Sequence, residues 1–275
     1  MLIAQITDLH ILAADQVYKA PVAGPAPDGE RVRADIDTAA WLARAVATLN
    51  ALVPRPEIAI VTGDLVDHGE PAEYENLRRL LAPLSMPVFL IAGNHDTRDG
   101  IRAHFGGDGY LPATGFLQYA IEDFAVRIVA LDTLVEGSHH GELCAERLDW
   151  LDRTLAARPE KPTLVMMHHP PFATGITYMD EHGFRSADAL AAVIARHPQI
   201  ERIACGHLHR SIDRRFAGTA PSTAHQVRLD LRPGVRLHFR LEPPGYQLHL
   251  WDGGGLVTHT AVIGDFPDPY PLPSA

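Results

Sequence analysis

The chain has 275 residues, of which 46% are hydrophobic and 21% charged, as in an ordinary globular enzyme with a substantial buried core. Its formal net charge of −10, with histidine neutral, argues against broad non-specific binding to nucleic acid or to an anionic membrane. The two cysteines, Cys144 and Cys205, lie far apart in the sequence, which disfavours a disulfide framework or a cysteine-based zinc site and favours a reducing cytoplasm.

The first residues lead directly into a predicted strand at 2–6 and then to Asp8, which leaves no room for a cleavable signal. Further short apolar runs predict strands that are buried on both faces, at 58–62, 88–92, 126–131, 163–167 and 203–205. Helical patterns lie between several of these runs, at 35–52, 71–81, 143–155 and 186–195. The alternation implies a largely parallel α/β core. Because no run of about 18 apolar residues is present, we expect a cytoplasmic protein without membrane attachment.

Two regions depart from this alternation. Residues 20–30 contain three prolines and two glycines, which predicts a loop that serves as a flap or an interface segment. After residue 210 the helical patterns end, and antiparallel strands are predicted at 235–241, 246–251 and 256–262. We therefore expect one domain over residues 1–265, in which a β extension at about 211–265 completes the sheet system. An irregular proline-rich tail follows at 266–275.

Five of the predicted core strands end in residue types that bind metal ions. In chain order these ends are Asp8-x-His10, Gly63-Asp64, Gly93-Asn94-His95-Asp96, His168-His169 and Gly206-His207-x-His209. Because the carboxyl ends of parallel strands share one edge of a sheet, these side chains should converge in space. Each motif alone has an ordinary interpretation as a strand-ending turn, a solvated loop or a helix cap. Five unrelated coincidences would be needed to explain all of them in that way.

This motif series resembles that of the calcineurin-like metallophosphoesterases, over about three quarters of the chain. Within that superfamily the sequence is similar to the class III cyclic nucleotide phosphodiesterases and the related bacterial glycerophosphodiesterases. The supporting matches are Tyr74, His168-His169-Pro170-Pro171 and Thr223-Ala-His225-Gln226. The resemblance implies a four-layer α-β-β-α sandwich with mixed sheets, and an oligomer that is at least a dimer.

The resemblance also implies two adjacent metal ions, either both divalent or of mixed valence. The first would be held by Asp8, His10 and His209, the second by Asn94, His168 and His207, and both would be bridged by Asp64. A ligand set of nitrogen and oxygen without cysteine fits iron, manganese, zinc or cobalt. His207 and His209 would lie on one extended segment and so point to the same side.

A water molecule between two such metals, roughly 3.5–4 Å apart, would lose its proton near neutral pH and attack the phosphorus as a bridging hydroxide. His95 resembles the family histidine that contacts the substrate phosphate or protonates the leaving group, and Asn94 would contact the substrate beside it. His225 is a further candidate for substrate contact by subgroup resemblance, with a structural role as the alternative. His169 could form a supporting hydrogen bond or act directly, and Asp96 could orient His95 or begin a helix.

We predict a phosphoric diester hydrolase for small diesters such as 3′,5′-cyclic nucleotides or glycerophosphodiesters. A phosphomonoesterase or protein phosphatase with the same metals is the main alternative, but such sites commonly add arginines, and here Arg98 and Arg210 only flank the motifs. A nuclease would need a basic groove, so we expect no stable nucleic-acid binding. A non-catalytic scaffold would not need competent residues at all seven ligand positions. The physiological diester and the native metals stay open.

Overall fold

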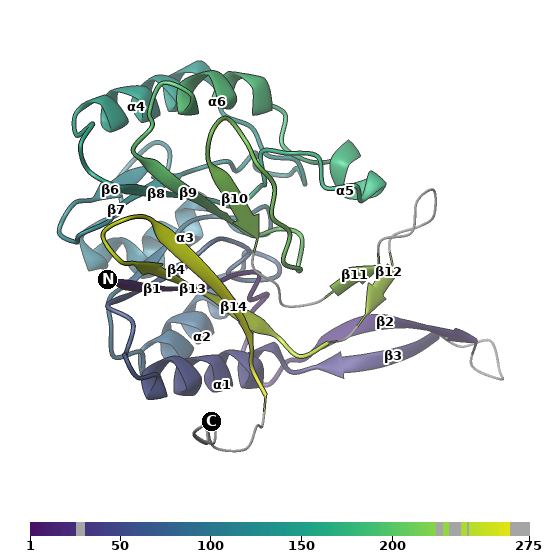
Figure 1. Cartoon of the computed structure of the whole chain (residues 1–275). Coiled ribbons are helices and arrows are strands. Elements are labelled where there is room, and N and C mark those ends of the chain that lie inside the picture. Colours follow the sequence, from purple (N-terminus) through teal and green to yellow (C-terminus); the bar gives the residue numbers. More distant parts are fainter. Residues whose placement is uncertain (26–30, 224–227, 231–237, 241, 265–275) are drawn as a thin grey trace, which may run out of the picture.

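Two five-stranded sheets face each other in the computed structural model, which describes residues 1–25, 31–223, 228–230, 238–240 and 242–264 (Figure 1). The first sheet has the strand order β14 (Leu256–Val262), β13 (Gly245–Trp251), β1 (Leu2–Ile6), β4 (Ile58–Val61) and β5 (Val88–Leu90). The second has the order β10 (Ala220–Thr223), β9 (Ile200–Cys205), β8 (Thr163–Met167), β7 (Arg127–Leu131) and β6 (Tyr119–Ile121).

Both sheets are mixed, and in each the central strands are parallel. In the first sheet β1, β4 and β5 run parallel, whereas β13 and β14 are antiparallel to their neighbours. In the second sheet β7 to β10 run parallel and β6 is antiparallel. The parallel strands therefore deliver their carboxyl ends to one side of the molecule, as the α/β pattern predicted.

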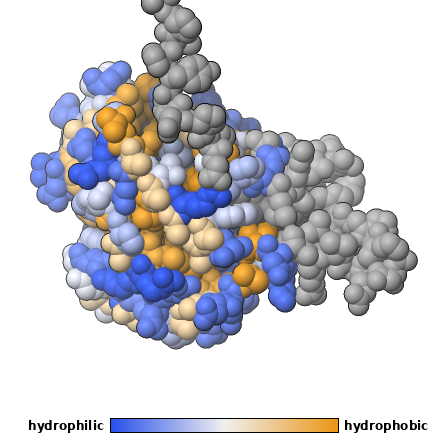
Figure 2. Space-filling model, turned by 90° about the horizontal axis from the view of Figure 1, so that it is seen from below, coloured by the Kyte–Doolittle hydropathy of each residue, from blue (hydrophilic) through white to orange (hydrophobic). Residues whose placement is uncertain are grey.

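Helices cover the outer face of each sheet (Figure 1). On the first sheet lie α1 (Thr38–Ala51), α2 (Pro71–Leu81) and α3 (Arg98–Phe105), which leads into the short 3-10 helix η1 (Gly106–Asp108). On the second sheet lie α4 (Ala145–Ala156) and α6 (Ala187–Ile194), while the five-residue α5 (Thr177–Glu181) stands at its rim. The outward face of the first helical layer carries many hydrophilic residues (Figure 2), as expected where a helix meets solvent.

The alternation of side chains along the strands creates three apolar layers. In β4, Ile58 and Ile60 pack between the two sheets, whereas Ala59 and Val61 pack against the helices of the first sheet. Strand β8 does the same on the other side, with Leu164 between the sheets. Because both faces are covered, every residue of these two strands is buried, and the four-layer α-β-β-α sandwich is confirmed.

The helix predicted at 35–52 begins later than expected, because residues 31–36 form a strand. That strand, β3 (Arg31–Ile36), pairs with β2 (Tyr18–Pro25), and the helix starts only at Thr38. The Asp37 carboxylate accepts the backbone N–H of Ala40 at 2.8 Å, which caps the helix. The predicted helix at 71–81 and the strand at 163–167 match α2 and β8 at both ends.

The prediction of a loop at 20–30 is wrong for residues 20–25, which belong to β2. In the described residues β2 and β3 form a separate two-stranded sheet that extends away from the sandwich (Figure 1). Each strand has only one partner within this sheet, so Pro21 and Pro25 can lack a backbone N–H without breaking a continuous ladder, and the register shifts between them. Residues 26–30 lie outside the described part of the chain.

The C-terminal β extension is present, but its strands divide among three sheets. Strands β13 and β14 complete the first sheet, and β10, which the sequence did not predict, joins the second. Of the strand predicted at 235–241, residues His238–Arg240 form β12, which pairs with β11 (Arg228–Asp230). The remainder of that strand and the tail at 266–275 lie outside the described residues. None of the helices in the described ranges combines the length and the apolar character needed to cross a bilayer.

Candidate metal centre

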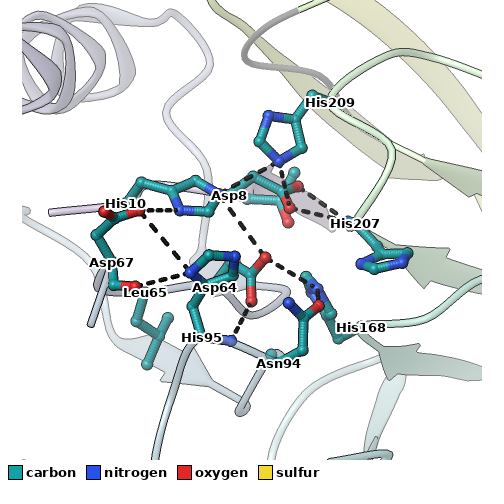
Figure 3. Close-up of polar contacts among 12 residues, drawn as sticks. Asp8, His10, Asp64, Leu65, Asp67, Asn94, His95, His168, His207 and His209 are labelled. Atoms are coloured by element: carbon teal, nitrogen blue, oxygen red, sulfur yellow. Dashed lines mark hydrogen bonds and ion pairs between the residues drawn. The ribbon is translucent and has the colours of Figure 1, made fainter. Parts of the chain in front are cut away.

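The predicted ligand residues lie together where the carboxyl ends of the two sheets meet (Figure 3). The Nε2 atom of His168 lies 3.3 Å from Oδ2 of Asp64, and Nε2 of His10 lies 3.7 Å from the same oxygen. On the other side of His10, Nε2 of His209 lies 3.2 Å from His10 Nε2 and 3.5 Å from Oδ1 of Asp8. Residues separated by about 200 positions therefore form one cluster.

The cluster divides into two groups that share Asp64 as a neighbour. In the first group, one ligand atom from each of Asp8, His10, Asp64 and His209 lies within 4.8 Å of all the others. The second group contains His168, His169 and His207. The amide oxygen of Asn94 lies 3.2 Å from His168 Nε2, so Asn94 is placed beside this second group. Asp64 stands between the groups, with its Oδ2 near a histidine of each.

Five of the seven predicted ligands have left-handed backbone conformations. Their φ values are 53° for Asp8, 43° for His10, 47° for Asp64, 73° for His207 and 51° for His209. The prediction that His207 and His209 lie on one extended segment is therefore wrong. Each sits at a sharp turn after β9, and both side chains still face the cluster (Figure 3). Such conformations are costly for residues other than glycine and are concentrated at functional sites.

Two glycines allow neighbouring segments to approach closely at this edge. A Cβ atom at Gly206 would collide with the Thr7 hydroxyl and would lie 2.8 Å from the carbonyl oxygen of Thr62. A Cβ atom at Gly93 would collide with the backbone nitrogen of Asp64. The glycine that precedes each of these ligand motifs is thus required by packing, because no side chain fits there.

The buried carboxylates and imidazoles perturb one another strongly. Burial raises the pKa of Asp8 to about 6, with the charge of Asp64 contributing. Burial also acts to raise the pKa of Asp64, but the charge and hydrogen bond of His168 outweigh it and hold that pKa well below the usual range. Burial disfavours a charged His168, yet the charge of Asp64 raises its pKa to about 9. In the absence of metal, the proton on His168 balances the negative charge of Asp64. A bound divalent cation would take the place of that proton.

The donor set fits metal ions. Burial lowers the pKa of His207 to about 3, so its imidazole is neutral and has a lone pair. His207 Nε2 is buried and lacks a hydrogen-bond partner among the described residues. The ring nitrogen of His209 that faces the carboxylates is Nε2, 3.5 Å from Oδ1 of Asp8. Buried polar atoms are normally satisfied, so unpaired imidazole nitrogens beside carboxylates are well suited to bind a cation.

Asp67 supports this cluster and was not predicted. The Nδ1–H of His10 donates to the Asp67 carboxylate at 2.9 Å, which turns His10 Nε2 toward the other ligands. The Nδ1–H of His95 donates to the backbone oxygen of Asp67 at 2.7 Å. Carboxylates that orient metal-binding histidines in this way are common. The signal that could have found Asp67 is its position three residues after Asp64, on the same loop.

Asp96 has neither of the roles considered for it. Its buried carboxylate accepts the backbone N–H groups of Gly93, Leu65 and Val66, at 2.8, 3.1 and 3.3 Å. Burial raises its pKa to about 7, and the Tyr74 hydroxyl lies 3.3 Å away. Helix α3 is capped by the next residue instead. Asp96 therefore braces the loops that follow β4 and β5 against each other.

His169 forms hydrogen bonds through both ring nitrogens. The Thr133 hydroxyl donates to its Nδ1 at 2.8 Å, and its Nε2–H donates to the His139 backbone oxygen at 3.2 Å. This arrangement gives His169 a supporting role, which is one of the two alternatives considered for it. His225 lies outside the described residues.

Comparison with known proteins identifies the family. The family model for calcineurin-like phosphoesterases matches residues 1–211. A protein of Arcobacter nitrofigilis named probable glycerophosphodiester phosphodiesterase is 34% identical over 278 residues, covering 99% of this chain and 97% of that protein. A protein of Rhodopseudomonas palustris named probable cyclic nucleotide phosphodiesterase is 40% identical over 233 residues, covering 82% and 84%.

A solved structure shows the same fold. A dimetal phosphatase from Danio rerio matches with a TM-score of 0.64 over 96% of this chain and 99% of its own, at 15% sequence identity. At that identity the likeness concerns the fold alone. The family model and the two relatives establish that this chain belongs to the calcineurin-like phosphoesterase family.

Proposed function

We propose that this protein is a metal-dependent phosphodiesterase that hydrolyses small phosphodiesters such as 3′,5′-cyclic nucleotides or glycerophosphodiesters. The observation that carries the proposal is the position of Asp64 between two groups of ligand atoms, one at Asp8, His10 and His209 and the other at His168 and His207. The names of the relatives, which cover nearly the whole chain, support a diester as the substrate class.

In this proposal Asp8, His10 and His209 would hold one metal ion, Asn94, His168 and His207 would hold a second, and the Asp64 carboxylate would serve both. When bound, a pair of divalent ions such as iron, manganese, zinc or cobalt would acidify a water molecule and neutralise charge on the phosphoryl oxygens. The Nδ1–H of His168 donates to the Thr62 carbonyl oxygen at 2.8 Å, which leaves its Nε2 available as a ligand atom.

His95 is the proposed acid, and Asn94 would contact the substrate beside it. Because its Nδ1–H donates to the Asp67 backbone oxygen, the Nε2 atom is the one available to the substrate. The side chain is 31% exposed, so a substrate can reach it. A protonated Nε2 can hydrogen-bond a phosphoryl oxygen or give its proton to the departing alkoxide.

Of the two arginines that flank the motifs, Arg98 is bound within the protein, which favours a diester over a monoester. The Nε and Nη2 atoms of Arg98 donate to the buried carboxylate of Asp132 at 2.7 and 2.9 Å, and Nη2 also donates to the Leu134 carbonyl oxygen. This guanidinium is committed to the protein, so it is not placed to neutralise the second charge of a monoester. A singly charged diester needs less neutralisation from the protein.

The assignment can be tested with a matched pair of chromogenic substrates. Protein stripped of metal with a chelator should be inactive and should regain hydrolysis of bis(p-nitrophenyl) phosphate on addition of Mn²⁺, Co²⁺ or Zn²⁺. Hydrolysis of p-nitrophenyl phosphate under the same conditions should have a lower kcat/KM. Equal or faster hydrolysis of the monoester would instead assign a phosphomonoesterase.

We also propose that the protein is at least a dimer and resides in the cytoplasm. The free thiols of Cys144 and Cys205 support a reducing compartment. Light scattering of the eluted protein would measure the mass of the oligomer, and a monomer at micromolar concentration would contradict the first part of this proposal.

A further inference from the structure

The imidazole of His139 lies at the mouth of the candidate metal centre, although no motif in the sequence assigns it a role. Its ring centroid is 6.3 Å from that of His95, and the two ring planes are tilted by 58°. His139 is exposed, so the space beside it is open to solvent. Neither of its ring nitrogens has a hydrogen-bond partner within the described ranges, whereas the ring of the adjacent His140 bonds the Ser138 hydroxyl.

The loop that carries His139 is fixed to the strand end that carries His168. The Nε2–H of His169 donates to the backbone oxygen of His139, and the Thr133 hydroxyl holds the other side of that ring. A Cβ atom at Gly141 would collide with the His169 ring, so the loop lies directly against it. The position of His139 is therefore coupled to that of the neighbouring ligand.

The same loop is held on its outer side by the segment before α6. The backbone oxygen of Gly141 accepts the N–H of Arg185 at 2.9 Å, and Gly141 forms a parallel bridge with Phe184. The N–H of Leu143 donates to the Ser186 hydroxyl at 2.9 Å. With anchors on both faces, the loop presents the His139 side chain at a defined place, which lowers the entropy lost when a ligand binds.

The arrangement of His95 and His139 suits an anionic oxygen. Two hydrogen bonds of about 2.8–3.0 Å to one oxygen can span ring centroids at this separation. The oxygens of a phosphodiester that do not link to carbon carry its negative charge, and hydrogen bonds to charged acceptors are the stronger ones. His95 marks the substrate side of the ligand cluster, and His139 faces it from the opposite loop.

We propose that His139 is a substrate-contacting residue that donates a hydrogen bond to a non-bridging oxygen of the phosphodiester, opposite His95. This inference rests on the proposed phosphodiesterase function and adds to it one residue that binds the phosphoryl group. His139 is not a metal ligand in this scheme, so its removal leaves the metal content unchanged.

The test compares His139→Ala with the wild-type protein after reconstitution with Mn²⁺. We expect kcat/KM for bis(p-nitrophenyl) phosphate to fall about 10- to 100-fold, as for loss of one hydrogen bond to a charged group. The dissociation constant of inorganic phosphate should rise by a similar factor, with two metal ions per chain in both proteins. His139→Gln, which keeps an N–H donor, should recover part of the loss. The control is His259→Ala, which removes an exposed histidine of β14 and should match the wild type.

The outcomes separate this inference from the proposed function. If the wild type hydrolyses the diester and His139→Ala matches it in both turnover and phosphate affinity, His139 has no role and the inference is wrong. Loss of a metal ion from His139→Ala would make it a ligand or a structural residue, which also overturns the inference. If the wild type binds phosphate but cleaves no diester, the proposed function fails, and the phosphate affinities still decide whether His139 binds the anion.

Discussion

At the scale of single residues, the candidate site depends on side chains that hold the ligands in place. Asp67 supports the predicted ligand His10, whose ring donates to its carboxylate, and also the neighbouring His95, whose ring donates to its backbone oxygen. The hydrogen bond to the Asp67 carboxylate fixes which ring nitrogen of His10 faces the cluster. It also makes that nitrogen more basic, so that it binds a cation more strongly. The two contacts can be separated by mutation, since a side-chain substitution leaves the backbone oxygen in place.

We therefore expect Asp67→Ala to weaken the first metal site. The affinity for that ion should fall about 10- to 100-fold, as is typical for loss of a carboxylate behind a metal-binding histidine. Asp67→Asn keeps an oxygen that can accept from His10 and should lose less. Competition with a chromophoric chelator would measure both affinities. Wild-type affinity in Asp67→Ala would mean that packing alone orients His10.

The sequence predicts the ligand types but not the residues that support them. Asp8, Asp64 and His168 could be placed in one site because strand ends converge in a parallel sheet. The roles of Asp67 and His139 depend on where particular side chains and carbonyl oxygens point, which no residue type specifies. The left-handed turns at the ligands were missed for the same reason, since φ values follow from the packing of the two sheets.

At the scale of elements, the side chain of Gln5 joins strands of both sheets beneath the candidate site. Its Nε2 group in β1 donates to the Thr62 hydroxyl at 2.9 Å, just after β4, and to the Cys205 carbonyl oxygen at 2.8 Å, at the end of β9. Its Oε1 accepts from Nε2 of His249 in β13 at 3.0 Å. The predicted ligands Asp8, Asp64 and His207 follow these strands within three residues, so Gln5 helps to hold the strands that position them.

Replacing Gln5 with leucine keeps the approximate size of the side chain but removes all three hydrogen bonds. We expect Gln5→Leu to lower the free energy of unfolding by about 1–3 kcal/mol for each buried partner left unsatisfied. It should also lower metal affinity, because one of the ties between the two sheets beneath the candidate site, the bond from Gln5 to the Cys205 carbonyl oxygen, is lost. Urea denaturation and metal titration would measure the two effects.

Gln199→Leu is the matched control for this element. Its Nε2 group is also buried and donates to the Leu155 carbonyl oxygen at 3.1 Å, which ties the segment before β9 to α4 and does not bridge the two sheets. This variant should lose stability and keep wild-type metal affinity. Equal metal affinity in both variants would show that Gln5 contributes only to stability.

Elements were predicted best where burial alone determines the pattern. Strands β1 and β8 are covered on both faces, so their apolar runs have clear ends. Strand β2 belongs to a separate two-stranded sheet and contains prolines, which are typical of loops. The sequence therefore predicted a loop at this place. Residues 35–37 were assigned to a helix because the helical period continues across the Asp37 cap into β3.

At the scale of the whole molecule, the candidate site exists only where the two sheets dock. Asp8, Asp64 and Asn94 come from the first sheet, whereas His168, His207 and His209 come from the second. The two sheets are held together by the hydrophobic effect, through the buried apolar layer between them that includes Ile60 and Met166. Polar groups buried in the same interior, such as His249, make the stability of the sandwich depend on pH.

Acid should destabilise the metal-free protein through His249. Burial, assisted by the charge of Arg202, lowers the pKa of this histidine from 6.5 to about 3. Its ring nitrogens form hydrogen bonds with the side chains of Gln5 and Thr258. A depressed pKa means that the contribution is complete above pH 6.5 and is lost as the pH falls toward 3. Between pH 7 and pH 5 the free energy of unfolding should fall by about 2 kcal/mol through this one group.

The substitution His249→Gln removes the titrating ring and retains both a hydrogen-bond donor and an acceptor. The unfolding free energy of this variant should therefore decline less over the same pH range. Urea unfolding of both chelated proteins at the two pH values measures this difference, and parallel declines would show that His249 is already protonated in the folded state at pH 5.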